Sequence, residues 1–212
     1  MAALTNIDTW VFDLDNTLYP PEMALFPQVN AKMTAYVMDA LGVPEADADA
    51  LRHKYYEEHG TTLAGLMAHH DLDPDPYLVA VHDIDFGVLS PDPALRNAIA
   101  MLPGRKIIYT NGTAPYAEAV TEARGLGGLF DAIYGVEHAD YHPKPARPAF
   151  ETVFNADGLV PSHSVMFEDE ARNLRVPFEM GLTTVHVAPD PAPADHIHHH
   201  TGSLARFLSG LT

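Results

Sequence analysis

The chain has 212 residues, of which 47% are hydrophobic and 19% charged, which is enough for one full hydrophobic core and a smaller subdomain. Its formal net charge is -17, from 29 acidic residues against 12 lysines and arginines. Such a surface repels nucleic acid and anionic membranes, so neither is an expected partner. The sequence contains no cysteine, which excludes disulfides, thiolate metal sites and cysteine nucleophiles.

The first predicted element is a buried strand that ends in two aspartates. Trp10, Val11 and Phe12 are aromatic or β-branched, as is typical of buried strands, and Asp13 and Asp15 follow them. Side chains two positions apart on an extended chain point the same way, so both carboxylates can face one small volume. Two such charges are tolerated when a cation neutralises them or when one carboxyl keeps a proton. If the stretch around Asp13 and Asp15 is considered alone, a solvated acidic turn is the alternative interpretation.

A purely helical block is predicted next, from about residue 22 to residue 84. Apolar residues recur at a stride of four between Leu25 and Leu41, which predicts an amphipathic helix that ends at Gly42. Three shorter helices follow, and they are predicted over residues 44–59, 61–70 and 76–83. The turn-rich residues 71–75 separate the last two.

From Pro91 onward, predicted helices and strands alternate. The predicted strands are 106–109, 132–134, 164–167 and 183–187, and the last of these is expected to be the final strand. The predicted helices are 92–101, 114–124, 147–156, 171–180 and 204–208, with Pro177 forcing a kink or a restart in the fourth of them. Such alternation implies a parallel, doubly wound sheet. We therefore predict an α/β protein with a Rossmann-like core, residues 1–21 and 85–212, and an inserted all-helical subdomain, residues 22–84.

Polar groups follow the later strands at the edge where open α/β sheets bind ligands. Thr110 follows the second predicted strand, and the backbone N–H groups of Asn111 and Gly112 come directly after it, where they could hold an anion. Lys144 stands between two prolines, which is an unusual way to display a solvated charge. Taken alone, Thr110 could instead cap the next helix and Lys144 could be a surface lysine.

Two more acids, Glu168 and Asp169, follow the strand predicted over residues 164–167. These acids could simply begin a helix, whose dipole favours them there. However, Mg²⁺ prefers oxygen ligands, typically one or two carboxylates with water and phosphate. A phosphoryl group in transfer needs such a metal together with hydrogen-bond donors around its oxygens. The combination of these groups, each placed after a strand, therefore indicates phosphoryl-transfer chemistry.

In this order the residues resemble the four sequence motifs of the haloacid dehalogenase-like hydrolase superfamily. The first motif, DxDxT, is matched by residues 13–17, and the second by Thr110 within the sequence IIYTNGT. The third is matched by Lys144-Pro145, and the fourth by Glu168-Asp169 with Asn173 four residues further on. The resemblance covers essentially the whole chain, and the helical block matches the cap that the superfamily inserts after its first motif.

The resemblance implies a role for each motif residue. Asp13 would be the nucleophile that forms an aspartyl-phosphate, and Asp15 would protonate the leaving oxygen and later activate water. Thr110 and Lys144 would hold the phosphoryl oxygens. The implied cofactor is Mg²⁺, with the Asp13 carboxylate, the Asp15 backbone carbonyl and Asp169 as ligands and Glu168 close by. The backbone around Leu14, Asn111 and Gly112 is expected to contact the substrate.

A narrower similarity is to the pyrimidine 5′-nucleotidase branch of this superfamily. It rests on LYP after the first motif, on LFPQVNAKM in the first helix and on the run YYEEHGTTLAGLMAHH within the helical block. In this branch the last segment lies near the leaving group of the substrate, which makes Tyr56, His59 and Gly60 candidate specificity residues. Packing within the helical block is the alternative role for Tyr56 and His59.

The sequence therefore predicts a Mg²⁺-dependent phosphomonoesterase for nucleoside 5′-monophosphates, with pyrimidine nucleotides preferred. Another small phosphate ester, such as a sugar phosphate or phosphoglycolate, is the alternative within the same fold. Dehalogenation is disfavoured. The dehalogenases of this superfamily lack the second acid, because no leaving oxygen needs a proton in their reaction, whereas Asp15 is present here. A phospho-receiver or a binding protein without turnover is the alternative from another class. The DxD spacing and the helical insert argue against the receiver, and the presence of both aspartates argues against the binding protein.

The sequence also suggests where the protein acts. No basic region followed by an apolar core begins the chain, and no apolar run reaches the roughly 18 residues that a membrane-spanning helix needs. We expect a soluble cytoplasmic monomer or homodimer whose partner is a small phosphorylated metabolite. The triplet at residues 198–200, three consecutive histidines, is expected to lie in a solvated loop, with adventitious metal binding as the alternative.

Overall fold

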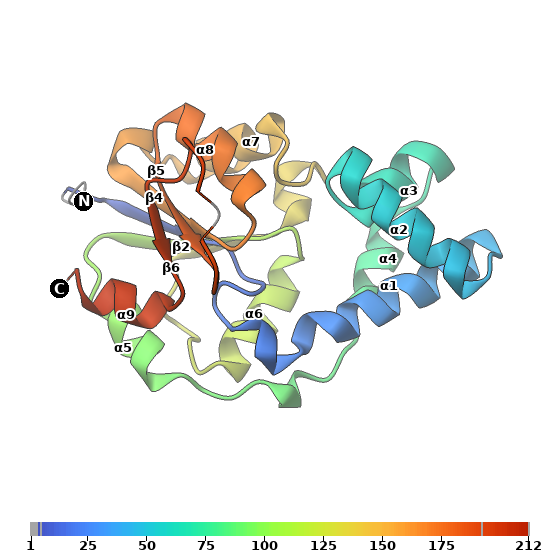
Figure 1. Ribbon diagram of the computed structural model, residues 1–212, viewed down its shortest axis with the longest axis horizontal. Helices are drawn as coiled ribbons and strands as arrows, with labels where there is room; N and C mark the ends of the chain where they lie inside the picture. The colour runs from blue at the N-terminus through green and yellow to red at the C-terminus, as the bar shows by residue number, and fades with distance from the viewer. Residues whose placement is uncertain (1–3, 5, 192, 212) are drawn as a thin grey trace.

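A six-stranded parallel sheet forms the core of the computed structural model, which describes residues 4, 6–191 and 193–211 (Figure 1). The strand order is β3-β2-β1-β4-β5-β6, and every adjacent pair is parallel. The strands are β1 Thr9–Phe12, β2 Arg105–Tyr109, β3 Ala132–Tyr134, β4 Ser164–Glu168, β5 Thr183–Val187 and β6 His199–Thr201. The predicted doubly wound α/β class is confirmed. The chain winds outward from β1 in both directions, which makes its carboxyl end the topological switch point of the sheet.

Helices cover both faces of the sheet. Successive residues of a central strand point to opposite faces, and here they are apolar on both, so each face must be covered. Trp10 and Phe12 of β1 belong to one hydrophobic cluster, with residues of the helices over 93–100, 114–123 and 204–209, whereas Val11 belongs to a second cluster with residues of the helix over 147–157. The helices are α1 Leu25–Leu41, α2 Glu45–His59, α3 Thr62–His70, α4 Pro74–Val81, α5 Pro93–Ala100, α6 Ala114–Ala123, α7 Arg147–Asp157, α8 Arg175–Met180 and α9 Leu204–Ser209.

Two predictions about local structure are wrong. The strand over residues 183–187 is not the last one, because β6 pairs with β5 at the edge of the sheet, so the histidine triplet does not lie in a solvated loop. The His200 Nε2–H donates to the Ala188 carbonyl oxygen at 2.9 Å. The fourth helix begins two residues earlier than predicted, at Pro74, because the Asp73 side chain accepts a hydrogen bond from the Asp75 N–H and caps it.

The predicted restart near Pro177 is confirmed. A short 3-10 turn over Ala171–Leu174 ends where α8 begins, and Pro177 lies in the first turn of α8. A proline costs no helical hydrogen bond there, since the first N–H groups of a helix have no partner within it.

Helices α1 to α4 pack on one another and stand at one end of the molecule, away from both chain ends (Figure 1). Residues 25–81 are all described, and they contain no strand. Gly65 in α3 allows close approach of α2, because a side chain at this position would overlap the Tyr55 ring, 2.2 Å from its added Cβ. The limits of the subdomain, residues 22 and 84, stay a prediction, and the predicted core segments include residues 1–3, 5, 192 and 212, which lie outside the described residues.

The buried Arg124 holds both connections between this helical block and the sheet. Its guanidinium donates to the carbonyl of Leu18, before the block, and to the carbonyl of Ser90 and the carboxylate of Asp92, after it. The Asp92 N–H donates in return to the Arg124 carbonyl at 3.0 Å. Only 2% of Arg124 is exposed, so the guanidinium end of these charge-assisted hydrogen bonds is shielded from water.

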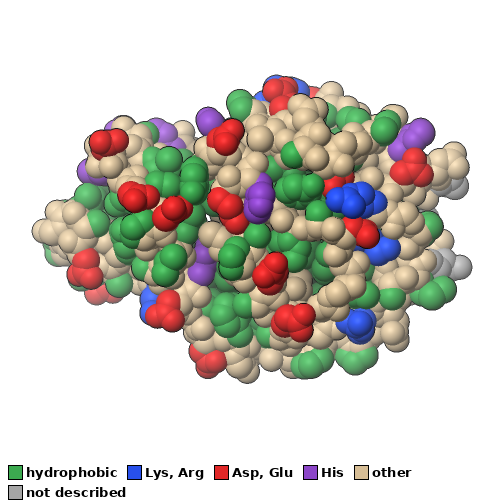
Figure 2. All heavy atoms as spheres, turned by 180° about the vertical axis from the view of Figure 1, so that it is seen from behind, with side chains coloured by type: hydrophobic (Ala, Val, Ile, Leu, Met, Phe, Trp, Pro, Cys, Tyr) green, Lys and Arg blue, Asp and Glu red, His purple; other side chains and the backbone are tan. Residues whose placement is uncertain are grey.

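The surface carries the acidic excess of the sequence. Acidic side chains are spread over both the helical block and the core on the face shown in Figure 2, where basic side chains are fewer. Within the described residues, no helix is both long enough and apolar enough to cross a membrane.

Candidate active site

A buried ion-pair network lies at the carboxyl ends of β1, β2 and β4. The Lys144 ammonium donates to Asp13 Oδ1 at 2.7 Å, to Glu168 Oε1 at 2.9 Å and to the Tyr109 carbonyl oxygen at 3.1 Å. Thr17 donates its hydroxyl to the other oxygen of Asp13 at 2.9 Å. Because Lys144 is 1% exposed, the alternative that it is a surface lysine is wrong.

The loop that carries Lys144 is fixed by Asn111. The Lys144 N–H donates to Asn111 Oδ1 at 2.8 Å, and Asn111 Nδ2 donates to the Lys144 carbonyl at 3.2 Å. Burial alone would lower the pKa of Lys144, but the charges of Asp13 and Glu168 outweigh it and raise that pKa. The lysine is therefore permanently charged.

Asp15 lies under two phenols from different parts of the chain. Tyr19 and Tyr116 donate their hydroxyls to Asp15 Oδ1 at 2.6 and 2.7 Å. Burial raises the pKa of Asp15, and the two phenolic hydrogen bonds oppose that rise. A carboxyl whose pKa is raised keeps its proton to a higher pH than an ordinary aspartate, which suits it to give a proton to a neighbouring oxygen.

Thr110 presents its hydroxyl to the same region. The Gly112 N–H donates to Thr110 Oγ1 at 2.9 Å, so the hydroxyl hydrogen can be given to another acceptor. The following helix, α6, is capped by Thr113, whose side chain accepts from the Tyr116 N–H. The alternative in which Thr110 is the cap of this helix is therefore wrong.

Three carboxylates gather beside this network. One oxygen each of Asp13, Glu168 and Asp169 lies within 4.8 Å of the others. Burial, followed by the nearby charges of Glu168 and Asp13, raises the pKa of Asp169 to about 10. Burial, followed by the charge of Glu168, likewise raises the pKa of Asp13 to about 7. These carboxyl groups therefore keep protons at pH values where an ordinary aspartate has lost its own, and a divalent cation could take the place of those protons.

The donor set fits Mg²⁺. All three acids offer oxygen atoms, which are the ligands that Mg²⁺ prefers. Asn173 donates to Glu168 Oε1 at 2.7 Å, while its own buried Oδ1 has no hydrogen-bond partner within the described residues. A water bound to a metal could satisfy this oxygen.

These groups line a cavity of about 350 Å³ between the sheet and the helical block. The block and the core touch across its wall. Tyr56 donates its hydroxyl to Glu170 at 2.7 Å, and the Arg172 guanidinium lies over the Tyr56 ring, 3.9 Å from its centre. Arg172 also donates to the Gly60 carbonyl at 3.2 Å. An added Cβ on Gly60 would lie 3.3 Å from the carbonyl oxygen of Lys144, so the absence of a side chain allows this close contact.

Most of the predicted site residues share this one cavity. Those that line it are Asp13, Asp15, Tyr56, Gly60, Thr110, Asn111, Gly112, Lys144, Glu168 and Asp169. Two do not. The Leu14 side chain is buried in the hydrophobic core, and the His59 imidazole faces His69 within the helical block.

Several residues of the site were not predicted. Tyr116 lies 101 positions from Asp15, and its only sequence signal is its place in the first turn of a helix that follows a motif strand. Tyr19 belongs to the LYP sequence, which suggested a family but not a contact with Asp15. The contacts of Arg172 depend on how the helical block meets the core.

A parallel sheet that brings a buried carboxylate, its paired lysine and a second carboxyl held by two phenols to its switch point defines an α/β enzyme of the group-transfer kind. The chain belongs to the haloacid dehalogenase-like hydrolase family, whose sequence model matches residues 7–176.

Similar proteins are found among both sequences and solved structures. Phosphate metabolism protein 8 of Saccharomyces cerevisiae is 26% identical over 198 residues, which are 84% of this chain but only 61% of that protein. The HAD hydrolase YfnB of Bacillus subtilis, in a structure bound to magnesium, is 17% identical with a TM-score of 0.62 over 97% of this chain and 99% of that chain. A HAD phosphatase from Thermococcus onnurineus is 16% identical with a TM-score of 0.63 over 97% and 98%. At these identities the structural likeness shows a common fold.

Proposed function

We propose that the protein is a Mg²⁺-dependent phosphomonoesterase that hydrolyses nucleoside 5′-monophosphates, with pyrimidine nucleotides preferred. The observation that supports this proposal best is the meeting of Asp13, Asp15 and Lys144 in one cavity. A nucleophile needs a carboxylate that is paired but accessible, and an ester oxygen needs a proton donor beside it. The presence of Asp15 again argues against dehalogenation.

The reaction would proceed in two displacements. A carboxylate oxygen of Asp13 attacks phosphorus, and the bond from phosphorus to the ester oxygen breaks as Asp15 gives that oxygen its proton. Water then attacks the aspartyl-phosphate while Asp15 takes a proton from it, and the bond from phosphorus to Asp13 breaks, which releases inorganic phosphate. Both phenols donate to Oδ1 of Asp15, so we assign the transferred proton to Oδ2.

Lys144 and Thr110 would hold the phosphoryl oxygens through the ammonium and the hydroxyl hydrogen. Asp13, Asp169 and the Asp15 carbonyl would hold Mg²⁺, with Glu168 beside them. When bound, the metal would supply positive charge that balances the carboxylates and the phosphoryl group.

The preference for a nucleotide rests on the cavity walls. A cavity of about 350 Å³ is within the size range of small-ligand sites. Aromatic side chains of Phe26, Tyr56 and Tyr77 line it, and a flat base can pack on such rings. Arg52 also lines it, and its buried Nε has no hydrogen-bond partner within the described residues, so a carbonyl oxygen of a pyrimidine could accept from it. A sugar phosphate or phosphoglycolate would leave most of this apolar wall uncovered.

The experiment is phosphate release from pyrimidine and purine nucleoside monophosphates, sugar phosphates and phosphoglycolate, with Mg²⁺ or with a chelator. Asp13→Asn is the blank, and Asp39→Asn, which changes an exposed aspartate of α1, is the matched control. We expect metal-dependent release that favours UMP or CMP, no release by Asp13→Asn and normal release by Asp39→Asn. Preference for a sugar phosphate would contradict the substrate, and an active Asp13→Asn protein would contradict the mechanism. No release from any ester would contradict the proposed function.

A further inference from the structure

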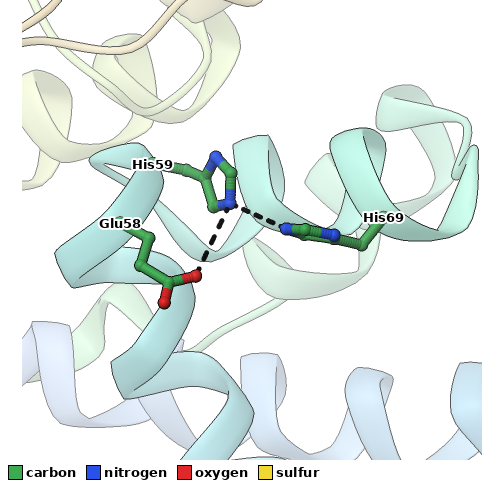
Figure 3. A group of neighbouring side chains, drawn as sticks. All are labelled: Glu58, His59 and His69. Carbon is green, nitrogen blue, oxygen red and sulfur yellow. Dashed lines mark hydrogen bonds and ion pairs between the residues drawn. The ribbon is translucent and has the colours of Figure 1, made fainter.

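Two imidazoles face each other at the ends of α2 and α3, on the helical block (Figure 3). His59 is the last residue of α2, and its Nε2 lies 2.9 Å from Nε2 of His69, which is in the last turn of α3. The carboxylate of Glu58 points to the same place, with Oε2 3.9 Å from the His59 nitrogen. One ligand atom from each of the three residues lies within 4.8 Å of the other two.

The rings are held in place by Tyr55, a buried residue of α2. The Tyr55 ring stacks on His69 with 5.3 Å between ring centres and an angle of 11°, and it meets His59 edge-on at 6.0 Å. Its hydroxyl lies 2.7 Å from Nε2 of the neighbouring His70. Because Tyr55 itself packs against Gly65 of α3, the geometry of the imidazole pair is built into the contact between the two helices.

We propose that Glu58, His59 and His69 form a binding site for a divalent transition metal, Zn²⁺ being the expected ion. Imidazole nitrogen and carboxylate oxygen are ligands that Zn²⁺ prefers, and two histidines with one glutamate is a donor set that leaves room for water. At present the two nitrogens can share only one hydrogen between them, whereas a metal would use the lone pairs of both. Mg²⁺ is disfavoured, because it demands oxygen ligands.

The proposed site is separate from the carboxylate cluster and lies within reach of solvent. Glu58 and His69 are exposed and His59 is partly buried, so an ion can enter and water can complete its coordination. The next residue after His59 is Gly60, whose Cα faces the carbonyl of Lys144. A bound metal would therefore restrain the end of α2 next to the loop that carries the active-site lysine.

The test measures Zn²⁺ bound at equilibrium, by dialysis followed by metal analysis, with Mg²⁺ in excess to occupy the carboxylate cluster. The variants are His69→Ala and His69→Gln, and the matched control is His53→Ala, which removes an exposed imidazole from α2, the helix that carries Glu58 and His59. The histidines at residues 198–200 are present in every variant, so they do not contribute to the difference. Circular dichroism checks that each variant folds, and His69→Gln keeps a polar side chain where alanine would leave a gap.

We expect the wild type and His53→Ala to bind one Zn²⁺ more tightly than either His69 variant. The expected loss is about 100-fold in affinity, because even partners outside the first coordination shell contribute about 10- to 100-fold. With Co²⁺ in place of Zn²⁺, the visible spectrum of the wild type should show a histidine-bound ion that is absent in His69→Gln. Equal Zn²⁺ affinity in the wild type and the folded His69 variants, or identical Co²⁺ spectra, would overturn the proposal.

Discussion

Replacement of Lys144 by methionine tests whether the charge of this lysine stabilises the folded protein by balancing the buried carboxylates. Its ammonium lies 2.7 Å from Asp13 and 2.9 Å from Glu168, and none of the three side chains is more than 7% exposed. Removal of one partner of a buried ion pair leaves an uncompensated charge, which costs about 3–5 kcal/mol. We therefore expect Lys144→Met to lower the free energy of unfolding by about this amount at neutral pH without metal.

Two conditions should reduce the loss. Lys144 is among the groups that lower the pKa of Asp13, so without it this pKa rises further above its ordinary value. At about pH 5 folded Asp13 is protonated whether or not the lysine is present, so Lys144 no longer compensates a charge on Asp13 and the loss becomes smaller. Mg²⁺ should also stabilise the variant more than the wild type, because the metal becomes the remaining cation beside the carboxylates.

The assay is urea denaturation of the wild type, Lys144→Met and Lys106→Met, with chelator or Mg²⁺, at neutral and acid pH. Lys106 is the matched control, since it stands on β2 and its ammonium donates to the backbone carbonyls of Leu102 and Gly104, near its own position. We expect Lys106→Met to lose less than about 1 kcal/mol. Equal stability of the two variants at neutral pH would refute the reasoning. A loss at Lys144 that does not change between neutral and acid pH would refute it as well.

Two further predictions concern the acids. In chelator, the free energy of unfolding should fall as the pH rises from about 4 to about 7, because folded Asp13, whose pKa is raised to about 7, keeps a proton that the unfolded chain has lost. Mg²⁺ would take the place of that proton, so the increase in melting temperature caused by Mg²⁺ should become larger as the pH rises over the same interval. If Mg²⁺ raised the melting temperature equally at every pH, Asp13 would not be a ligand. Asp15→Asn should slow the hydrolysis of esters with poor leaving groups more than that of esters with good leaving groups. The measurement is kcat for a series of esters whose leaving groups differ in pKa. Equal losses of kcat across the series would contradict acid catalysis by Asp15.

The sequence was sufficient to predict the core of this fold because its central strands are buried on both faces. Val11, Ile107 and Met166 are all fully buried, and each lies in a short apolar run within its strand. Strand β6 has no such pattern. His199 and His200 are only partly buried, and the strand forms because its backbone pairs with β5 at the sheet edge. An edge strand of polar residues therefore gives little signal in sequence.

The same distinction holds for the candidate site. Groups that directly follow parallel strands meet at one edge whatever the detailed packing, so the meeting of Asp13, Thr110 and Glu168 could be predicted. The contact of Tyr116 with Asp15 depends on the exact rotation of α6, and that of Arg172 with Tyr56 depends on the distance between the helical block and the sheet. Neither quantity is encoded in a short motif.

The position of Arg124 has a consequence for how the helical block could be exchanged. Its guanidinium binds the chain at Leu18, where the chain leaves the sheet, and again at Ser90 and Asp92, where it returns. The two attachment points thus have a fixed spacing that depends on the core alone. The block is in this sense modular at its two connections: a different helical insert joined at the same two points would keep the Arg124 hydrogen bonds, and it would have to replace the contacts that Tyr56 and Gly60 make with the core. A chimaera that kept Mg²⁺-dependent phosphate release while its preferred ester changed would demonstrate this property, and a chimaera whose core failed to fold would disprove it.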